Sequence, residues 1–371
     1  MAALLLPEFT VHLDAAEDDI KKLFKIVKPE WNEDKIIVKN MSGGFSCLTS
    51  RVYLEDTPDD AFTVRVQKLF VALKDNCEDL KLDTKFEVRV VQEISKIGYF
   101  PTVHAVFANG FCYKYISGKP LVHFDKKTKT KPEIDRNDIK TMVEKLAEIH
   151  MIKLENVDYT KTDFFDNYDT ILEKVYPENS VITAKNIIEK EYQEIKSYIK
   201  EFNLPIVLCH GDPHAGNVVV DEDKDQLTFV DWELSHIGYQ AYDLAYCVRM
   251  LHFEGYVMNI QMIPSAAKDQ TPEISMGEML KWYFAKWSKL NMKEFDEEAF
   301  EELQRQVKYF ELVWCLVFII MFGNLFANSK AQVLSAEFPV DPTGMVQSVY
   351  NFYCRIKEQT LQEFIPDLFV S

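Results

Sequence analysis

Short apolar segments bounded by turn residues dominate the first third of the chain, and such segments are typical of β-strands. They cover residues 48–53, 62–66, 102–107 and 111–115. The last two flank Asn109-Gly110, a dipeptide typical of hairpin turns. Helical spacing of apolar residues predicts helices over residues 16–31 and 84–97, and we expect a turn at Thr57–Asp60. The first third is therefore predicted to be rich in strands.

After Gly118-Lys119-Pro120 the pattern changes to longer segments with helical spacing. Helices are predicted over residues 138–150, 183–202, 272–289, 297–328 and 345–364. This change near residue 118 places a domain boundary there. We expect a smaller N-terminal lobe, residues 1–117, and a larger, mainly helical C-terminal lobe, residues 118–371.

One segment is apolar enough to require a comparison with membrane spans. Leu312–Ser329 carries no charged residue, and a spanning helix needs about 20 mostly apolar residues. Gly323, Asn324 and Asn328 interrupt the segment near its end, and no basic cluster flanks it. We predict a buried core helix and no stable insertion into a membrane.

Composition and charge narrow the function. The chain has 371 residues, of which 47% are hydrophobic, so it can form a large core. The net charge of −17 opposes the phosphate backbone of nucleic acids, which excludes them as expected partners. The same charge suits a cationic ligand.

The cysteines indicate a reducing compartment. Seven are scattered along the chain: Cys47, Cys77, Cys112, Cys209, Cys247, Cys315 and Cys354. No two of them form a CxxC pair, and their number is odd, so thiols fit better than a disulfide framework or a zinc site. The short apolar run near the N-terminus has no basic residues before it, unlike a secretory signal. We therefore expect a cytoplasmic protein.

Candidate chemistry is concentrated in Leu208–Glu233, LCHGDPHAGNVVVDEDKDQLTFVDWE. Residues 218–220 and 227–230 are predicted strands of a hairpin, which brings Asp212, Asn217 and Asp231 together. Phosphoryl transfer needs an oriented nucleophile and metal ions that neutralise the phosphate charge. Asn217 and Asp231 could supply the oxygen ligands that Mg²⁺ prefers. Asp212 could orient the acceptor hydroxyl and take its proton.

The stretch HGDPHAGN, followed by a hairpin and Asp231, resembles the catalytic and metal-binding signature of the protein-kinase-like fold. This version resembles the small-molecule branch, which includes the aminoglycoside phosphotransferases. The run from Asp231 to Asp243, DWELSHIGYQAYD, is similar to that of the choline/ethanolamine kinases. The resemblance implies an α+β bilobal fold with an N-terminal antiparallel-sheet lobe that binds nucleotide. It also implies ATP and Mg²⁺, and a first step of phosphatidylcholine or phosphatidylethanolamine synthesis.

The resemblance carries over to further residues of the chain. It implies a phosphate loop formed by Ser42, Gly43, Gly44, Phe45 and Ser46. Arg65 matches the phosphate-binding arginine, and Glu87 matches the helical glutamate that holds it. Lys114, Tyr115 and Ile116 match the hinge whose backbone groups hold adenine. Leu146–His150 resembles a helix motif of the fold, while His210 and Asp243 are expected to brace the catalytic loop.

The acceptor site is where the sequence departs from the family. The family's Glu-Trp pair falls on Met250 and Leu251, just after Arg249, and its late pair of tryptophans falls on Phe318 and Met321. A quaternary ammonium calls for an aromatic box and a carboxylate. The candidates for this site are Glu233, Tyr239, Glu254, Trp314, Phe318, Tyr350 and Tyr353. Aromatic residues at helical spacing are more often part of a core.

Three functions stay open on the sequence alone. The first is an ATP-dependent kinase of choline or ethanolamine, that is, of a small cationic alcohol. The second is a kinase of another small hydroxylated molecule on the same fold, which Arg249, Met250 and Leu251 favour. The third is a catalytically weak, kinase-like binding protein, against which the intact Asp212, Asn217 and Asp231 argue. The sequence leaves the oligomeric state open, and the resemblance suggests a homodimer.

Overall fold

The computed structural model describes most of the chain in two compact units. The residues that it describes are 3–41, 47–67, 84–121, 135–174, 176, 184–199, 204–221, 226–257, 274–327 and 342–364. The first unit is formed by Met1–Gly118 and Val219–Val230, and the second by Lys119–Val218 and Asp231–Ser371. The sequence predicted a boundary after residue 117. In the structure the chain also returns to the first unit at Val219 and leaves it again after Val230, so the later hairpin belongs to the first unit.

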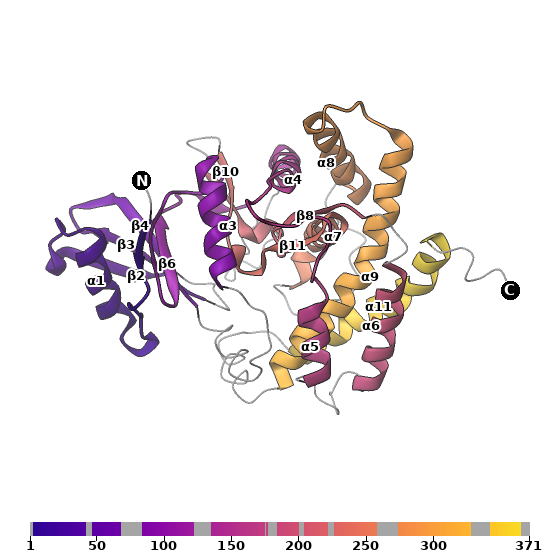
Figure 1. Cartoon of the computed structure of the whole chain (residues 1–371), viewed down its shortest axis with the longest axis horizontal. Helices are drawn as coiled ribbons and strands as arrows, with labels where there is room; N and C mark the ends of the chain where they lie inside the picture. Colours follow the sequence, from indigo (N-terminus) through magenta and orange to yellow (C-terminus); the bar gives the residue numbers. More distant parts are fainter. Residues whose placement is uncertain are drawn as a thin grey trace. The chain divides into compact units, whose positions relative to one another are not determined.

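A six-stranded sheet forms the first unit (Figure 1). Its strands are β1 (Leu4–Leu6), β2 (Ile36–Asn40), β3 (Cys47–Leu54), β4 (Thr57–Gln67), β5 (Val103–Phe107) and β6 (Gly110–Lys114). They lie in the order β1-β5-β6-β4-β3-β2. Four of the five pairings are antiparallel, which confirms the predicted antiparallel sheet. The exception is β1, which pairs in parallel with β5.

The turn expected at Thr57–Asp60 was wrong, because those residues begin β4. Leu54 of β3 pairs with Thr57, so the chain reverses at Glu55 and Asp56 instead. Pro58 is tolerated in the strand because the pairing of β4 with β6 begins only at Phe62. Pro58 and the two aspartates after it therefore indicated a turn, but in the structure they lie in the part of β4 that extends beyond its pairing with β6.

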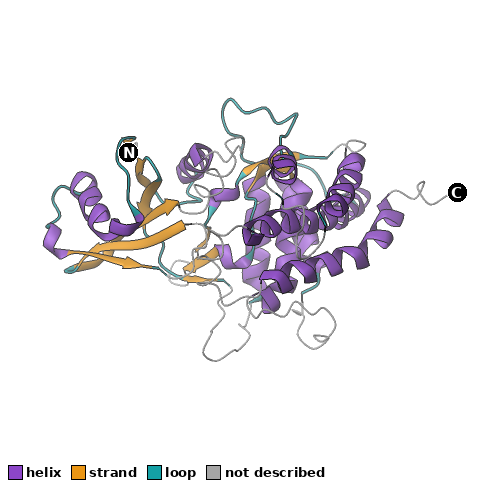
Figure 2. Cartoon of the chain, turned by 90° about the horizontal axis from the view of Figure 1, so that it is seen from below, coloured by secondary structure: helices purple, strands orange, loops and turns teal. Residues whose placement is uncertain are grey.

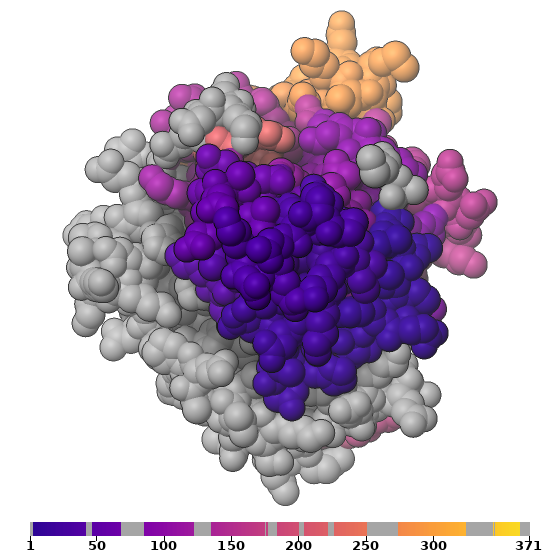
Figure 3. Space-filling model, turned by 90° about the vertical axis from the view of Figure 1, so that its left-hand side faces the viewer, coloured from indigo at the N-terminus to yellow at the C-terminus, as the bar shows by residue number. Residues whose placement is uncertain are grey.

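The two faces of β4 carry different chemistry because strand side chains alternate. Phe62, Val64 and Val66 belong to the buried core against α1 (Ala16–Val27), where the rings of Phe24 and Phe62 lie 5.5 Å apart. Arg65 points to the other face, toward α3 (Thr84–Lys96). Figure 1 shows α1 and α3 on opposite sides of the sheet. Figure 3 views this unit from the side of α1, where the first residues of the chain form a continuous surface.

The hairpin of the candidate site belongs to the first unit. Its strands are β9 (Val218–Asp221) and β10 (Gln226–Phe229), close to their predicted ranges. Asp221 at the end of β9 accepts a hydrogen bond of 2.6 Å from the Ser117 hydroxyl. This bond ties the end of the hairpin strand to the segment that follows β6.

The second unit is mainly helical, as predicted (Figure 2). Its helices are α4 (Arg136–His150), α5 (Asp166–Lys174), α6 (Lys185–Ile199), α7 (Gln240–Val257), α8 (Met276–Leu290), α9 (Glu297–Ala327) and α11 (Pro342–Phe364). Its strands are β7 (Lys119–Pro120), β8 (Ile206–Cys209) and β11 (His236–Tyr239), of which β8 and β11 form an antiparallel pair. Two short 3-10 helices, η3 (Ala215–Asn217) and η4 (Trp232–Leu234), flank the hairpin in sequence.

The apolar segment expected as a core helix lies in α9. Among the described residues, Glu297–Gly323 is the one stretch long and apolar enough to cross a membrane by length and composition. However, 83% of its most apolar 18-residue stretch is buried inside the structure. The helix packs against α7, α6 and α11, so its apolar surface is covered by protein as in the core helix of a soluble protein.

Candidate active site

The candidate catalytic loop, His210–Asn217, begins where β8 ends. Val207, Leu208 and Cys209 of β8 are buried, and Cys209 lies opposite His236 in the pairing of β8 with β11, at the edge of the loop. Gly211 then takes φ +85°, and a Cβ at this position would lie 2.0 Å from the Leu234 carbonyl oxygen. Only glycine fits here, because the loop backbone passes directly over Leu234, the last residue of η4.

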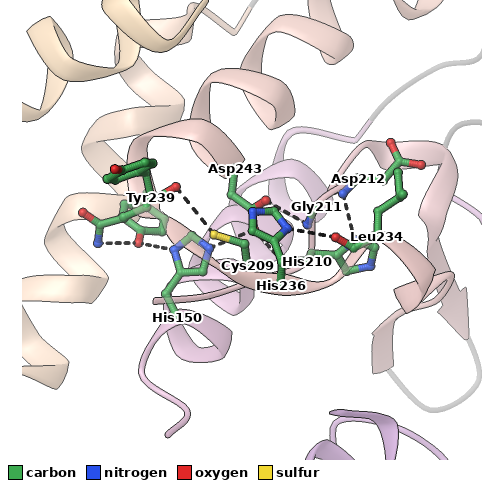
Figure 4. A network of polar contacts seen from close by, with 11 residues as sticks. His150, Cys209, His210, Gly211, Asp212, Leu234, His236, Tyr239 and Asp243 are labelled. Carbon is green, nitrogen blue, oxygen red and sulfur yellow. Dashed lines mark hydrogen bonds and ion pairs between the residues drawn. The ribbon is translucent and has the colours of Figure 1, made fainter. Parts of the chain in front are cut away.

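A buried carboxylate holds the first residues of this loop (Figure 4). Asp243, in the first turn of α7, accepts hydrogen bonds from the backbone N–H of His210 (2.7 Å) and of Gly211 (2.9 Å). Its Oδ2 also lies 3.1 Å from His150 Nε2 at the end of α4. Asp243 and His150 are fully buried, so these bonds are protected from water.

The network continues to two residues that the sequence did not single out. The Tyr283 hydroxyl of α8 lies 2.6 Å from His150 Nδ1 and accepts a hydrogen bond of 2.9 Å from the Gln240 amide. Burial alone raises the pKa of Asp243, but the hydrogen bond from His150 and the nearby histidines outweigh it and lower that pKa. Asp243 is therefore held as a carboxylate, and helices α4, α7 and α8 meet at the catalytic loop.

Asp212 and Asn217 are joined inside the loop. The Asn217 amide donates to Asp212 Oδ2 at 2.9 Å and to the Asp212 carbonyl oxygen at 3.0 Å. Asp212 Oδ1 is buried and accepts no hydrogen bond from the described residues. A buried carboxylate oxygen without a donor is costly unless a ligand satisfies it. This geometry suits a carboxylate that receives a hydroxyl group.

Asp231 follows the hairpin in a left-handed backbone conformation, with φ 66° and ψ 62°. Such a conformation is rare for a residue with a Cβ and is common at functional sites. The next residue, Trp232, is buried with its ring 4.4 Å from that of His210. Glu233, a candidate acceptor residue, lies half-buried in η4.

The residues of this region fit a bound Mg²⁺. Among the described residues no three His, Cys, Asp or Glu side chains cluster as a metal site. Mg²⁺, however, keeps several waters and uses few protein ligands. Because Asn217 turns its amide nitrogen toward Asp212, the oxygen of the same amide stays free for a cation. Asn217, directly before β9, and Asp231, shortly after β10, would hold the ion.

The first unit carries the candidate nucleotide residues. Arg65 Nε lies 3.2 Å from Glu87 Oε1, and both side chains are buried. Gln67 donates to Glu87 Oε2 at 3.4 Å, so the Glu87 carboxylate lies between two donors. The structure therefore places together the arginine and the glutamate that the sequence paired.

The expected hinge residues have mixed roles. The backbone N–H groups of Lys114 and Tyr115 donate within the sheet region, to the carbonyl oxygens of Thr102 and Ala61. The Lys114 side chain pairs with Asp60. Ile116 comes directly after these bonded residues, outside the strand. The expected phosphate loop, residues 42–46, lies outside the described residues.

A family comparison identifies the architecture. The chain matches the family described as choline/ethanolamine kinase over residues 38–333, which is most of its length. The chain belongs to the choline/ethanolamine kinase family. Ethanolamine kinase 1 of Mus musculus is 23% identical over 362 residues, covering 94% of this chain and 92% of the mouse protein.

Solved structures agree on the fold. An ethanolamine kinase of Plasmodium vivax has a TM-score of 0.66 at 18% identity, covering 92% of this chain and 89% of that chain. A choline kinase of Cryptosporidium parvum has a TM-score of 0.64 at 17% identity, covering 95% and 99%. The protein-kinase-like fold expected from the sequence is thus confirmed, and the kinases of this family phosphorylate an alcohol.

Near the catalytic loop, the structure assembles an aromatic column that the sequence identified only in part. The Tyr246 ring of α7 stacks on His214 with centroids 6.5 Å apart. It meets Trp314 of α9 at 5.9 Å, and Trp314 meets Phe318 at 5.5 Å. Tyr246 was not singled out, although it lies one helical turn after Asp243 and so shares its face of α7. We call Tyr246, Trp314 and Phe318 the aromatic column.

A charged pair lies one helical turn from the aromatic column, after Tyr246 in α7 and before Trp314 in α9. Arg249 of α7 forms an ion pair with Glu311 of α9, and its guanidinium lies 4.7 Å from the Phe352 ring. Burial raises the pKa of Glu311, although Arg249 opposes the shift. Met250, where the family has a glutamate, is buried. Leu251 and Glu254 lie in α7, and their side chains are outside the described ones.

Three other candidate acceptor residues have contacts elsewhere. Tyr239 packs on Phe310 with centroids 5.3 Å apart. The Tyr353 hydroxyl donates a hydrogen bond of 2.6 Å to Glu191, which links α11 to α6. Tyr350 stacks beside Tyr353 at 6.4 Å. These contacts are those of core and helix-bracing residues.

Proposed function

We propose that this protein transfers the terminal phosphate of ATP to the hydroxyl group of choline or ethanolamine. The observation that carries the proposal is the state of Asp212 in the catalytic loop. Asn217 holds one oxygen of its carboxylate, Oδ2, while the other, Oδ1, has no hydrogen-bond partner among the described residues. Family membership supplies the reaction class, and the names of the relatives supply the two acceptors.

In this proposal Asp212 accepts the hydrogen bond of the acceptor hydroxyl, orients its oxygen and takes its proton as the phosphate is transferred. Asn217 and Asp231 hold Mg²⁺, which neutralises charge on the phosphates when it is bound. Arg65, fixed by Glu87, binds the phosphates, and the backbone around Ile116 binds adenine. Asp243 and His210 act through the backbone by holding the loop.

The aromatic column supports a cationic acceptor. Aromatic faces attract ammonium groups, and the half-buried Tyr246 places such a face beside His214 of the loop, whereas Trp314 is buried behind it. The pairing of Arg249 with Glu311 and the apolar Met250 favour a second candidate: a kinase of another small hydroxylated molecule whose charge differs from that of choline.

We also infer a cytoplasmic location. The six described cysteines are free thiols, five of them buried, which fits a reducing compartment. Burial raises the pKa of the Cys112 thiol to about 12, so this thiol stays protonated and unreactive. The covered α9 supports a protein that does not span a membrane.

ADP release by the purified protein with Mg²⁺ and ATP tests the proposed reaction. The acceptors are choline, ethanolamine, N-methylated ethanolamines, aminoglycosides and simple sugars. We expect choline or ethanolamine to accelerate release most strongly. If neither does so while the protein still binds nucleotide, the proposed acceptors are wrong, and acceleration by another alcohol supports the second candidate.

A further inference from the structure

His214 lies inside the catalytic loop with no role in the reaction proposed so far. It is the N-cap residue of η3, where its Nδ1 accepts a hydrogen bond of 3.0 Å from the Gly216 N–H. Because Nδ1 is the acceptor, the proton of the neutral ring is on Nε2. That nitrogen lies 3.6 Å from Asp212 Oδ2. The cap thus directs an N–H group toward the proposed base.

Two further contacts fix the ring in this position. His214 and Tyr246 are nearly parallel, with 19° between their ring planes, and Tyr246 in turn meets Trp314 edge to face. On the other side, a Cβ at residue 216 would lie 2.7 Å from His214 Cε1, so a glycine leaves room for the ring. The imidazole therefore has one orientation, between the base and the aromatic column.

The two oxygens of Asp212 have unequal surroundings as a result. Oδ2 accepts from the Asn217 amide and faces the positive edge of His214 Nε2–H. Oδ1 is buried and has no hydrogen-bond partner among the described residues. At 3.6 Å the histidine is too far for a full hydrogen bond, but its N–H dipole still points toward Oδ2 and attracts it. A rotation of the carboxylate would lose both interactions.

We propose that His214 is a positioning residue for phosphoryl transfer. Together with Asn217 it holds Oδ2 of Asp212, which leaves Oδ1 as the oxygen that the acceptor hydroxyl satisfies. This inference rests on the proposed function. The competing role is purely structural, since an N-cap by itself satisfies a backbone N–H at the start of a helical turn.

Two substitutions separate these roles. His214→Asn keeps a good N-cap, because an asparagine oxygen can accept from the Gly216 N–H, but its amide is too short to reach Asp212. His214→Gln weakens the cap but can place an amide N–H near the position of Nε2. We expect kcat to fall roughly 10- to 100-fold in His214→Asn, with KM for ATP unchanged, and to be largely restored in His214→Gln. Thermal stability should show the opposite order.

The inference is overturned if kcat depends on the quality of the N-cap, that is, if His214→Asn has the kcat of the wild type and His214→Gln has a lower one. Crystal structures of the wild type and of both variants provide a test that needs no acceptor. We expect the Asp212 carboxylate to keep its orientation in His214→Gln and to rotate or become disordered in His214→Asn. An unchanged carboxylate in His214→Asn also overturns the inference. Absence of turnover by the wild type would instead reject the proposed function, and the crystal structures would still decide the role of His214.

Discussion

A single carboxylate, Asp243, connects three helices to the residues that precede Asp212. Its two oxygens accept from two backbone N–H groups and from His150, and none of these groups is exposed to water. Removing one partner of such a buried network leaves donors unsatisfied, which costs more than the bond itself contributes. The position is therefore sensitive to a change as small as one atom.

Asp243→Asn should lower the free energy of unfolding by about 3 kcal/mol at neutral pH, because the amide nitrogen would face a donor. The folded-state pKa of Asp243 lies below its ordinary value of 3.8. The contribution of the ionised Asp243 to the free energy of unfolding is thus present above pH 3.8 and is lost as the pH falls through the folded-state pKa. Urea unfolding from pH 7 to pH 3 measures this, with the exposed Asp18→Asn as control. A difference that grows toward low pH would contradict the assignment.

Asp212→Asn keeps the shape of the proposed base but removes its ability to take a proton. We expect kcat to fall roughly 10²- to 10⁴-fold while folding and nucleotide binding stay close to those of the wild type. ADP release measures the first quantity, and calorimetry with nucleotide measures the second. Substantial turnover by this variant would show that another group accepts the proton.

At the scale of elements, β4 separates packing from chemistry by the alternation of its side chains. One face contributes Phe62, Val64 and Val66 to the core with α1, while the other presents Arg65 to Glu87 of α3. An arginine in an apolar strand was informative in the sequence because arginine is rarely buried without a partner. The position of α3 in the first unit therefore determines where Glu87 holds Arg65, the candidate phosphate-binding residue.

Glu87→Gln should disturb this arrangement without creating a cavity. The neutral amide removes the negative charge that pairs with Arg65, and its nitrogen can face Gln67 only when the Gln67 amide also turns over. We expect KM for ATP to rise about tenfold and the free energy of unfolding to fall by roughly 1–3 kcal/mol. Glu93→Gln is the control, because Glu93 on the same helix forms only a surface pair with Lys96. Equal effects of the two variants would separate Glu87 from nucleotide binding.

Long periodic helices and the catalytic loop could be predicted from the sequence, whereas α7 and β1 could not. Helix α7 is buried on nearly all sides over residues 240–250 and carries its polar residues among apolar ones, so it has no clear amphipathic period to reveal it. Strand β1 has only three residues, and its pairing with β5 is a contact between distant segments. The motif residues Asp212 and Asn217 were recognisable because their spacing is specific. Tyr246 and Tyr283 were not, because a tyrosine in a buried helix has the same local pattern whether it packs or functions.

For the whole molecule, the net charge of −17 affects a cationic acceptor before it reaches the site. A negative field raises the local concentration of cations and is screened by salt. We expect KM for choline or ethanolamine to rise several-fold between about 0.02 M and about 0.3 M salt. A neutral alcohol of the same shape, with carbon in place of the ammonium nitrogen, is the control. The same salt dependence for both would show that the field has no part in acceptor binding.

The chain passes between its two units three times, and this order has a consequence for synthesis on the ribosome. The sheet of the first unit is complete in sequence by Gly118, but its hairpin, Val219–Val230, emerges only after about 100 residues of the second unit. At roughly 5–20 residues per second, this delay is on the order of 10 s. Strand β1 has a similar delay, since it must persist unpaired until β5 emerges about 100 residues later. The nascent N-terminal unit therefore stays unfinished during that interval, and nascent-chain chaperones have time to bind it before β9 and β10 complete it.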